Sequence, residues 1–422
     1  MEKAVEIKKC RVCGKENLIE ILSLGNQYIS NFVDSKEEQK AKVPLELVLC
    51  DVNSGGCGLL QLKHTTPSNL MYQNYWYRSG INKTMTEALA DITKKAEEII
   101  KLKEGELVLD IGCNDGTLLR SYKTRELKLV GFDPAKNLLE HSRKGTTKII
   151  NDFFNAQAFQ KEFGKEKAKL ITSIAMFYDL DKPNEFVADI KKVLNENGMW
   201  IIQMSYLPLM LKQNAFDNIC VEHLEYYSLA SLENLLKRHK MEAIGAEIND
   251  VNGGSYRVYI KHNESKLKAP EKEEKKLSEL REYEKKLGLE NKKVYKEFAK
   301  RVNKIKKEVV EFIENETKKG KKIFVYGAST KGNTLLQYFE LDNSLISAAA
   351  ERNPDKFGKK TIGTLIPIIS EEQARKEKPD YFLILPWHFL KEFVKREKEY
   401  FEQGGKFIVP LPEFKIIGKE TK

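Results

Sequence analysis

Residues 107–119 read LVLDIGCNDGTLL, an apolar run that ends in an acid and continues through a glycine turn into a helical pattern. A second apolar run, residues 127–132, ends in Asp133. This order is typical of a nucleotide-binding β-turn-α-β unit with an acid at the tip of its second strand. Asp110 and Asp115 would repel a pyrophosphate but tolerate the sulfonium cation of S-adenosylmethionine. The turn therefore predicts a methyltransferase, with Asp133 on the ribose hydroxyls; a Rossmann-like turn with another ligand, or with none, is the alternative.

Apolar runs and helical patterns alternate from residue 105 to about residue 260, after an amphipathic helix expected at 82–103. The expected strands are 107–111, 128–132, 147–150, 169–174 and 198–204, followed by a closing hairpin at 249–261. Such alternation predicts an α/β fold with a doubly wound parallel sheet and an antiparallel edge.

Residues after the third and fourth expected strands complete a predicted cofactor site. Asp152 and Phe153 follow the third strand, where an adenine ring commonly meets a polar and an apolar group. Residues 173–179 follow the fourth strand. The residues that we expect to bind S-adenosylmethionine at this edge are Asp110, Gly112, Asn114, Asp115, Gly116, Asp133, Asp152, Phe153 and Met176.

Four of the six cysteines lie within the first 57 residues. Cys10 and Cys13 form a C-x-x-C-G knuckle, and Cys50 and Cys57 form a wider pair whose spacer contains two glycines. Two cysteine pairs joined by strand-like segments suit tetrahedral thiolate coordination of zinc. The pattern predicts a closed, structural zinc site; four reduced structural cysteines are the alternative.

A second strand-turn-helix pattern begins near Lys321. Residues 327–332 read GASTKG, and a later apolar run ends in Glu351. This G-x-S-x-x-G pattern resembles an NAD-binding turn, but Ser329 replaces the middle glycine that lets a pyrophosphate approach the backbone. The turn and Lys331 could hold a diphosphate at a helix N-terminus. Further strands are expected at 381–385 and 406–409.

The composition of the chain indicates which kinds of binding partner to expect. The net charge of +10 is spread along the chain, and no arginine-rich stripe with interleaved aromatics occurs, which argues against nucleic-acid binding. Residues 1–9 lack the apolar core of a signal peptide, and no apolar run is long enough to span a bilayer. We therefore expect a cytoplasmic protein without membrane contact, a monomer or a homodimer. Residues 263–320, rich in Lys and Glu, predict two solvated connecting helices.

These features in this order resemble the three-domain sugar C-methyltransferases of deoxysugar biosynthesis, over essentially the whole chain. The resemblance is carried by the cysteine pairs, YWYRSG at 75–80, the turn at 110–116, EHLEYYS at 222–228, GGSYR at 253–257, the turn at 327–333 and Pro386-Trp387. It implies a zinc-binding domain (1–80), a class I methyltransferase domain (81–262), a helical connector (263–320) and a Rossmann-like, sugar-nucleotide-binding domain (321–422).

The resemblance also implies a reaction. Family members methylate a carbon next to the ketone of a nucleotide-linked keto-sugar, which requires a base to form an enolate that attacks the methyl of S-adenosylmethionine. His223 is the expected base, with Glu222 beside it to orient it or to stabilise the enolate oxygen. Tyr77 is the expected active-site tyrosine of the family; Tyr75 is its alternative and an expected cofactor contact. The expected substrate-binding residues are Tyr227, Arg257, Ser329, Lys331, Asn333, Glu351, Asn353 and Trp387.

Two positions depart from the patterns of known members. Cys220 stands where sugar 3-C-methyltransferases can carry a tyrosine, and Tyr178 and Asp179 stand where many class I enzymes carry Glu-His. These departures leave the proton-transfer roles and the methylated atom open. One alternative is methyl transfer to an oxygen or nitrogen of a sugar or small metabolite. Another is an NAD-dependent oxidoreductase, although Ser329 in the C-terminal turn argues against it.

Overall fold

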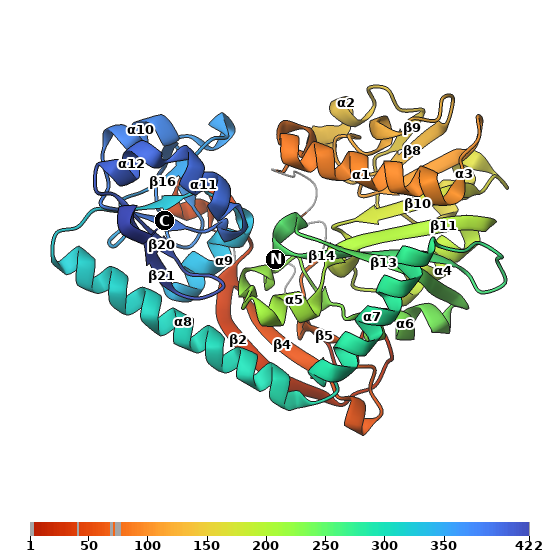
Figure 1. The fold of residues 1–422 in the computed structure, drawn as a ribbon, viewed down its shortest axis with the longest axis horizontal. Coiled ribbons are helices and arrows are strands. Elements are labelled where there is room, and N and C mark those ends of the chain that lie inside the picture. Colours follow the sequence, from red (N-terminus) through yellow and green to blue (C-terminus); the bar gives the residue numbers. More distant parts are fainter. Residues whose placement is uncertain (1–3, 40–41, 68–70, 72–76, 422) are drawn as a thin grey trace.

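A computed structural model describes residues 4–39, 42–67, 71 and 77–421. Figure 1 shows two α/β lobes, which strands β2 (Leu18–Tyr28) and β4 (Lys42–Cys50) and helix α8 (Lys292–Lys318) connect along their lower side. No helix in the described ranges combines the length and apolarity that a membrane crossing needs.

The larger lobe is built on a seven-stranded sheet of order β13-β14-β11-β10-β7-β8-β9. Its strands are β7 (Leu107–Ile111), β8 (Lys128–Phe132), β9 (Lys148–Ile150), β10 (Ala168–Ile174), β11 (Leu194–Ser205), β13 (Met241–Asn249) and β14 (Ser255–His262). Strands β7 to β11 pair in parallel, whereas β14 runs antiparallel between β11 and β13. The predicted doubly wound sheet with an antiparallel edge is confirmed.

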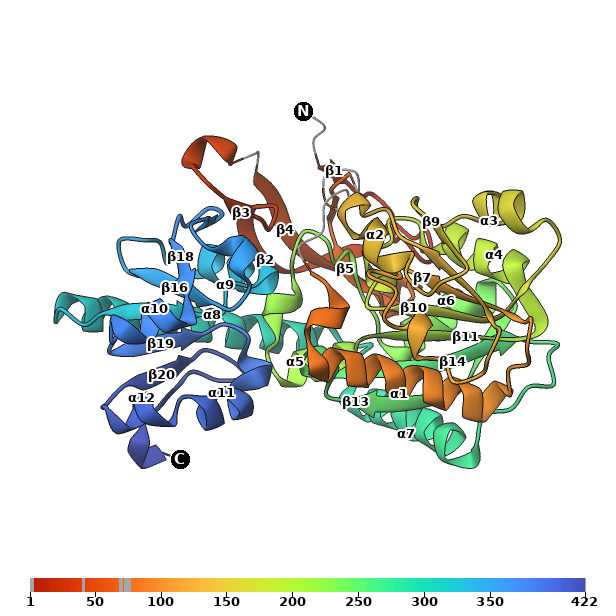
Figure 2. The same ribbon diagram turned by 90° about the horizontal axis from the view of Figure 1, so that it is seen from above.

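Helices cover both faces of this sheet because its strands are apolar on both sides (Figure 2). Within β7, Val108 packs on the face covered by α1 (Lys83–Ile100), whereas Leu107 and Leu109 face the opposite core. The helices that pack on that opposite side are α3 (Ala156–Phe163), α4 (Pro183–Val193) and α6 (Leu229–Arg238). The carboxyl ends of the parallel strands are left for loops, which is where ligands bind in such sheets.

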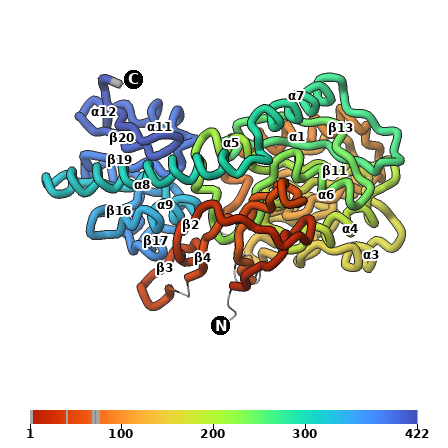
Figure 3. Tube along the Cα trace, turned by 90° about the horizontal axis from the view of Figure 1, so that it is seen from below, coloured from red at the N-terminus to blue at the C-terminus, as the bar shows by residue number. Residues whose placement is uncertain are grey.

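The N-terminal segment does not form a compact lobe of its own. Strands β2, β4 and β5 (Leu60–Leu62) form an antiparallel sheet whose fourth strand, β12 (Glu225–Tyr226), comes from the region after β11. The short pairs are β1 (Val5–Glu6) with β6 (His64–Thr65), and β3 (Phe32–Val33) with β17 (Lys360–Thr361). In Figure 3 this red segment lies across both lobes, so it ties the C-terminal lobe to the loop that carries β12.

The smaller lobe contains a six-stranded sheet of order β18-β16-β15-β19-β20-β21. Its strands are β15 (Ile323–Tyr326), β16 (Ala348–Glu351), β18 (Ile368–Ser370), β19 (Tyr381–Ile384), β20 (Lys406–Val409) and β21 (Lys415–Ile417). Its helices are α9 (Thr330–Phe339), α10 (Glu371–Lys376), α11 (Leu390–Arg396) and α12 (Lys398–Glu402). Only β21 is antiparallel, so the expected Rossmann-like architecture is present.

The expected pair of helices is present as α7 (Glu271–Leu287) and α8, but α8 is not a solvated connector. Helix α8 buries a stripe at three- and four-residue spacing, formed by Tyr295, Phe298, Val302, Ile305, Val309 and Ile313. That stripe belongs to the same core as β2, β4 and β15. The Lys and Glu residues of α8 occupy its other faces, which explains why composition alone suggested a solvated helix.

Candidate active site and metal site

The four N-terminal cysteines converge at one point. The sulfur atoms of Cys10, Cys13, Cys50 and Cys57 all lie within 4.8 Å of one another, and all four are free thiols. Cys10 and Cys57 are 3.5 Å apart, and Cys13 and Cys50 are 3.3 Å apart. Four sulfurs in this arrangement fit a tetrahedral zinc ion, which thiolates hold at about 2.3 Å. With no position left for water or substrate, such a site is structural.

The cysteine knuckle is anchored to the methyltransferase sheet. Asn184, in the first turn of α4, donates hydrogen bonds to the backbone oxygens of Arg11 and Val12, each 2.9 Å long. Arg11 also pairs with Asp181, at 3.4 Å, just before the same helix. The knuckle therefore has direct contacts to the loop that follows β10.

The glycine turn after β7 lies close to the side chain of Met176. Gly112 has φ +74°, and a Cβ atom there would lie 3.1 Å from Cγ of Met176. Asp110 is buried and accepts a 2.6 Å hydrogen bond from the Thr172 hydroxyl on β10. Burial raises the pKa of Asp110 to about 7, against the effect of the Thr172 bond. Asp110 thus braces the sheet beneath the turn.

Asp133 lies at the tip of β8, as predicted. Its carboxylate oxygens accept hydrogen bonds from the backbone N–H groups of Asn114 (2.8 Å) and Ala135 (2.9 Å). A carboxylate has about four acceptor positions, so two remain for ribose hydroxyls. The carboxylate is therefore oriented by the turn and still able to bind a ligand.

Asn114 and Asp115 hold the segment that precedes α1. Asn114 donates to the backbone oxygen of Tyr77 and accepts from the N–H of Ser79. Asp115 accepts from the N–H of Gly80, at 2.8 Å. Tyr77 is 43% exposed, and desolvation of its hydroxyl and the charge of Asp115 raise its pKa to about 12.

The remaining expected cofactor residues lie at the same sheet edge. Asp152 is exposed and accepts a hydrogen bond from the backbone of Phe153, whose ring is 44% exposed after β9. Gly116, with φ +77°, approaches the backbone of Ser142, where a Cβ atom would lie 2.9 Å from its oxygen. Tyr75 lies outside the described residues.

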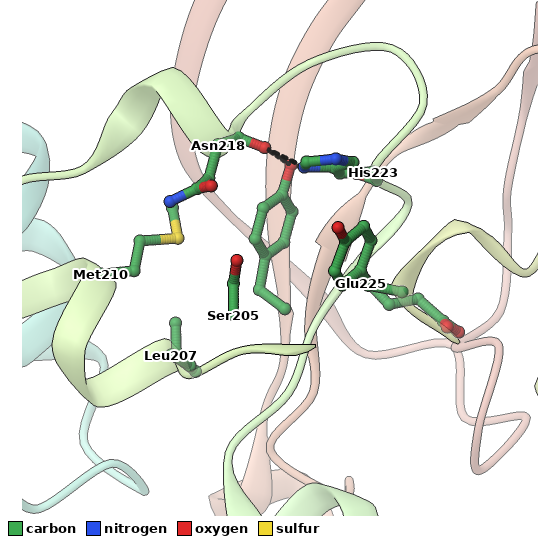
Figure 4. Close-up of a pocket in the computed structure, with 8 residues that line it drawn as sticks. Ser205, Leu207, Met210, Asn218, His223 and Glu225 are labelled. Carbon is green, nitrogen blue, oxygen red and sulfur yellow. Dashed lines mark hydrogen bonds between the residues drawn. The ribbon is translucent and has the colours of Figure 1, made fainter. Parts of the chain in front are cut away.

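His223 is held by the loop between β11 and β12. Its Nδ1 lies 2.8 Å from the backbone oxygen of Asn218, as Figure 4 shows. A backbone oxygen accepts only, so Nδ1 carries the proton and Nε2 is the basic nitrogen of the neutral ring. Burial and the positive charge of Lys331 lower the pKa of His223 to about 3.

A small pocket opens beside His223 at the ends of β10 and β11. Its described lining residues are Tyr178, Ser205, Leu207, Met210, Asn218, His223, Glu225 and Tyr226. The Tyr178 ring meets the imidazole edge-on, with 4.3 Å between ring centres. Two tyrosines thus adjoin the histidine in this pocket: Tyr178, whose ring meets the imidazole, and Tyr226, whose hydroxyl donates to the backbone oxygen of His223 at 3.0 Å. In the sequence, only the position of Tyr178 after the fourth expected strand indicated a place in the site. No sequence pattern indicated Asn218.

Two acids flank the histidine differently. Burial raises the pKa of Glu222, and a hydrogen bond from the Cys220 thiol opposes that shift. Glu225 is 1% exposed, accepts a hydrogen bond from the Tyr227 hydroxyl, and has a pKa that burial raises well above its usual range. Tyr227 is itself fully buried in the core between the sheet and α6, and Arg257 is buried on β14, where it contacts Gln203 and Asp91.

The C-terminal lobe reaches this site through Lys331 and Trp387. Lys331 Nζ lies 2.6 Å from Asn218 Oδ1, and the Trp387 indole donates to Asp217 Oδ2 at 3.1 Å. Both Asp217 and Trp387 are buried. Trp387 is therefore a contact between the lobes, next to the His223 loop.

Most of the expected substrate-binding residues around the turn before α9 make hydrogen bonds within the protein. Ser329 caps α9 by accepting from the N–H of Gly332, and Asn333 is buried and donates to the backbone of Asn31. Glu351 accepts from the backbone N–H groups of Ala328, Arg352 and Asn353. Asn353 caps the short turn that follows it. Six of the expected substrate-binding residues lie in this lobe. Among them, Lys331 is the one whose charged group contacts the His223 loop.

Models of known families match three consecutive parts of the chain: a zinc-binding domain at residues 10–72, a methyltransferase domain at 81–243 and a C-methyltransferase C-terminal domain at 250–412. The C-methyltransferase NovU of Streptomyces niveus is 29% identical over 419 residues, 98% of each chain. Partial matches among solved structures include the plantazolicin methyltransferase BpumL with SAH (14% identity, TM-score 0.33, 41% of this chain and 82% of that one). Another is magnesium protoporphyrin IX methyltransferase (ChlM) of Synechocystis PCC 6803 with SAM (9%, TM-score 0.31, 42% and 79%).

The seven-stranded sheet, its glycine turn and the matched methyltransferase domain define an S-adenosylmethionine-dependent methyltransferase. The chain belongs to the C-methyltransferases that join a zinc-binding domain, a methyltransferase domain and a C-methyltransferase C-terminal domain. Its cofactors are S-adenosylmethionine and, at the four-cysteine cluster, zinc.

Proposed function

We propose that this enzyme methylates the carbon next to the ketone of a nucleotide-linked keto-deoxysugar, with His223 as the base. The observation that carries the proposal is the bond from His223 Nδ1 to the backbone oxygen of Asn218, at 2.8 Å. It fixes a neutral imidazole with a basic Nε2 in a pocket at the carboxyl ends of β10 and β11. Ligands of α/β sheets bind at this end of the strands.

The proposed reaction has two steps. Nε2 of His223 takes the proton from the carbon next to the ketone, and the C–H electron pair becomes the double bond of an enolate. S-adenosylmethionine supplies an electrophilic methyl group on sulfur. The enolate carbon attacks that methyl, the carbon–sulfur bond breaks toward sulfur, and the ketone re-forms. His223 then releases its proton to solvent, which restores the base.

A donor near the ketone oxygen would stabilise the enolate. Tyr178 supports this role best, because it lines the same pocket and its ring touches His223. A phenol that is neutral at pH 7 can donate to a developing oxyanion. Glu222 is assigned a supporting role rather than proton abstraction, because burial raises its pKa and so favours the neutral acid, which is a poor base.

The nucleotide is proposed to lie between the lobes, with its diphosphate near Lys331. Lys331 is the cation that reaches the His223 loop, and Ser329 caps the adjoining helix N-terminus. Asn333, Tyr227, Arg257 and Trp387 are engaged in buried contacts, which supports a role for them in shaping the site. We place the domain boundaries near residues 80, 262 and 320.

Family membership supports carbon as the methyl acceptor over oxygen or nitrogen, and it gives no support to an NAD-dependent reaction. The test is product analysis with S-adenosylmethionine and a panel of dTDP-, UDP- and GDP-linked keto-sugars. We expect a new carbon-bound methyl in the NMR spectrum of one product. A methyl found on oxygen, with no exchange of the sugar proton next to the ketone in D2O, would overturn the carbon assignment.

A further inference from the structure

Three groups lie in series where the lobes meet: Lys331 of the C-terminal lobe, and Asn218 and His223 of the loop between β11 and β12. The Lys331 ammonium binds Asn218 Oδ1 at 2.6 Å, and the backbone oxygen of the same Asn218 binds His223 Nδ1 at 2.8 Å. Asn218 is buried and is also held by its own bond to the backbone of Ala215. A cation of the C-terminal lobe is thereby joined to the base through one immobilised residue.

The Lys331 ammonium has no ion pair in the described part of the chain. No carboxylate oxygen lies within 4.0 Å of its Nζ there, although an ammonium offers three donors. Its charge acts on both His223 and His388, and together with burial it lowers the pKa of each to about 3. Lys331 is thus a cation with unused binding capacity beside two neutral imidazoles.

Most of the other acidic groups near His223 are held toward their neutral forms. The ionisable groups near His223 are Tyr178 and Asp179 from the segment after β10, Asp217, Cys220 and Glu222 on the loop itself, Glu225 and Tyr226 on β12, and Lys331 from α9. Burial raises the pKa of Asp217, Glu222, Glu225 and Tyr226, which favours their neutral forms. Lys331 is the cation of the set.

We propose that Lys331 makes the proton affinity of His223 depend on an anionic group of the substrate. Without that group, the ammonium disfavours a positive charge on the imidazole, so the base is weak. A diphosphate bound to the ammonium compensates its charge, and the imidazolium formed by proton abstraction becomes more favourable. The inference rests on the proposed function of His223, and it makes Lys331 a positioning residue that acts through Asn218 and through its field.

The consequence is a base that strengthens when substrate is bound. A general base works best when its pKa is near the operating pH, and His223 in the free protein is far below it. The substrate would therefore help to activate the group that deprotonates it. A keto-sugar without a diphosphate would meet the weak form of the base.

The test uses NMR of 15N-labelled imidazoles in the full-length protein. The chain has six histidines, and His223→Gln identifies the signal of His223. Wild type is compared with Lys331→Met, Lys331→Gln and Lys331→Arg, each with and without saturating inorganic pyrophosphate. The matched control is Lys306→Met, which removes a cation that pairs with Glu340 on the surface.

Removal of the Lys331 charge should move the His223 titration to a pH about one unit higher, which is a roughly tenfold larger protonated fraction at a fixed pH well above both midpoints. Lys331→Arg and Lys306→Met should titrate as wild type does. Pyrophosphate should raise the midpoint in wild type and leave the Met and Gln variants unchanged. Calorimetry of S-adenosylhomocysteine binding is the control that shows whether each variant is folded.

Equal His223 titrations in wild type, Lys331→Met and Lys331→Gln would overturn the inference, and so would a wild-type titration that saturating pyrophosphate does not move. Neither result bears on whether His223 is the base. That is decided separately by methyl transfer in His223→Ala, so the two failures are distinguishable.

Discussion

Nδ1 of His223 lies 2.8 Å from the backbone oxygen of Asn218. A carbonyl oxygen as partner fixes the tautomer, whereas a carboxylate partner would also attract a proton to the ring. The residue that orients the base is therefore a main-chain group, which substitution of the Asn218 side chain does not remove. Lys331 grips the side chain of the same residue, at 2.6 Å from its Oδ1.

The first prediction concerns the metal. Purified protein should contain about one zinc per chain, because four thiolates converge within 4.8 Å. Cys10→Ser and Cys57→Ser should lower the zinc content and the melting temperature. Cys113→Ser, which alters a buried cysteine of the turn after β7, is the control and should retain the metal. Elemental analysis that finds no metal in fresh, unchelated protein would contradict the site.

The second prediction concerns the ribose acid. Asp133→Ala should weaken S-adenosylhomocysteine binding by about 1.5–3 kcal/mol, because it removes charge-assisted hydrogen bonds. Asp133→Asn keeps the shape of the side chain and should lose less. Isothermal titration calorimetry measures both. Unchanged affinity in the alanine variant would mean that Asp133 does not hold the ribose.

The third prediction separates backbone strain from contact at the glycine turn. Gly112→Ala should destabilise the fold by about 1–3 kcal/mol, because Gly112 has φ +74° and an added Cβ would lie 3.1 Å from Met176. Gly105→Ala is the matched control, since Gly105 has φ +80° with nothing within 4 Å. Denaturation should show the larger loss for Gly112→Ala, which should also weaken S-adenosylhomocysteine binding. Equal losses, with cofactor affinity intact, would count against the close approach at this turn.

The fourth prediction concerns pH. The pKa of His223 is lowered to about 3 in the folded protein, below the unfolded value of about 6.5. The unfolded chain therefore binds the proton first, so the stability that His223 contributes above pH 6.5 is lost as the pH falls toward 3. Between pH 7 and pH 5, the free energy of unfolding of wild type should fall by about 1–2 kcal/mol more than that of His223→Gln. Parallel urea unfolding curves at the two pH values measure this; identical pH dependences would show that His223 titrates normally.

Local sequence predicted the methyltransferase sheet and the position of the glycine turn after β7 well. The expected strands 107–111 and 128–132 match β7 and β8 residue for residue, because each is an apolar run closed by a turn and an acid. The four zinc ligands were likewise predictable from cysteine spacing. In each case a few adjacent residues carry the chemistry.

Contacts between distant segments could not be predicted in this way. Trp387 and Asp217 are 170 residues apart in the sequence and meet only because the lobes pack together. Asn218 orients His223 through its main chain, which no side-chain pattern reveals. The contact between the rings of Tyr178 and His223 also joins two segments that are far apart in the sequence.

The most direct test of the account is exchange of the sugar proton next to the ketone, followed in D2O by NMR with the nucleotide-linked keto-sugar that the panel identifies. Wild type should exchange this proton, and His223→Ala should lose exchange and methyl transfer by at least about a hundredfold while its S-adenosylhomocysteine affinity is unchanged. Glu222→Gln should lose less, because Glu222 does not take the proton. A His223→Ala enzyme that exchanges the proton and methylates at near wild-type rates would contradict the assignment of His223 as the base.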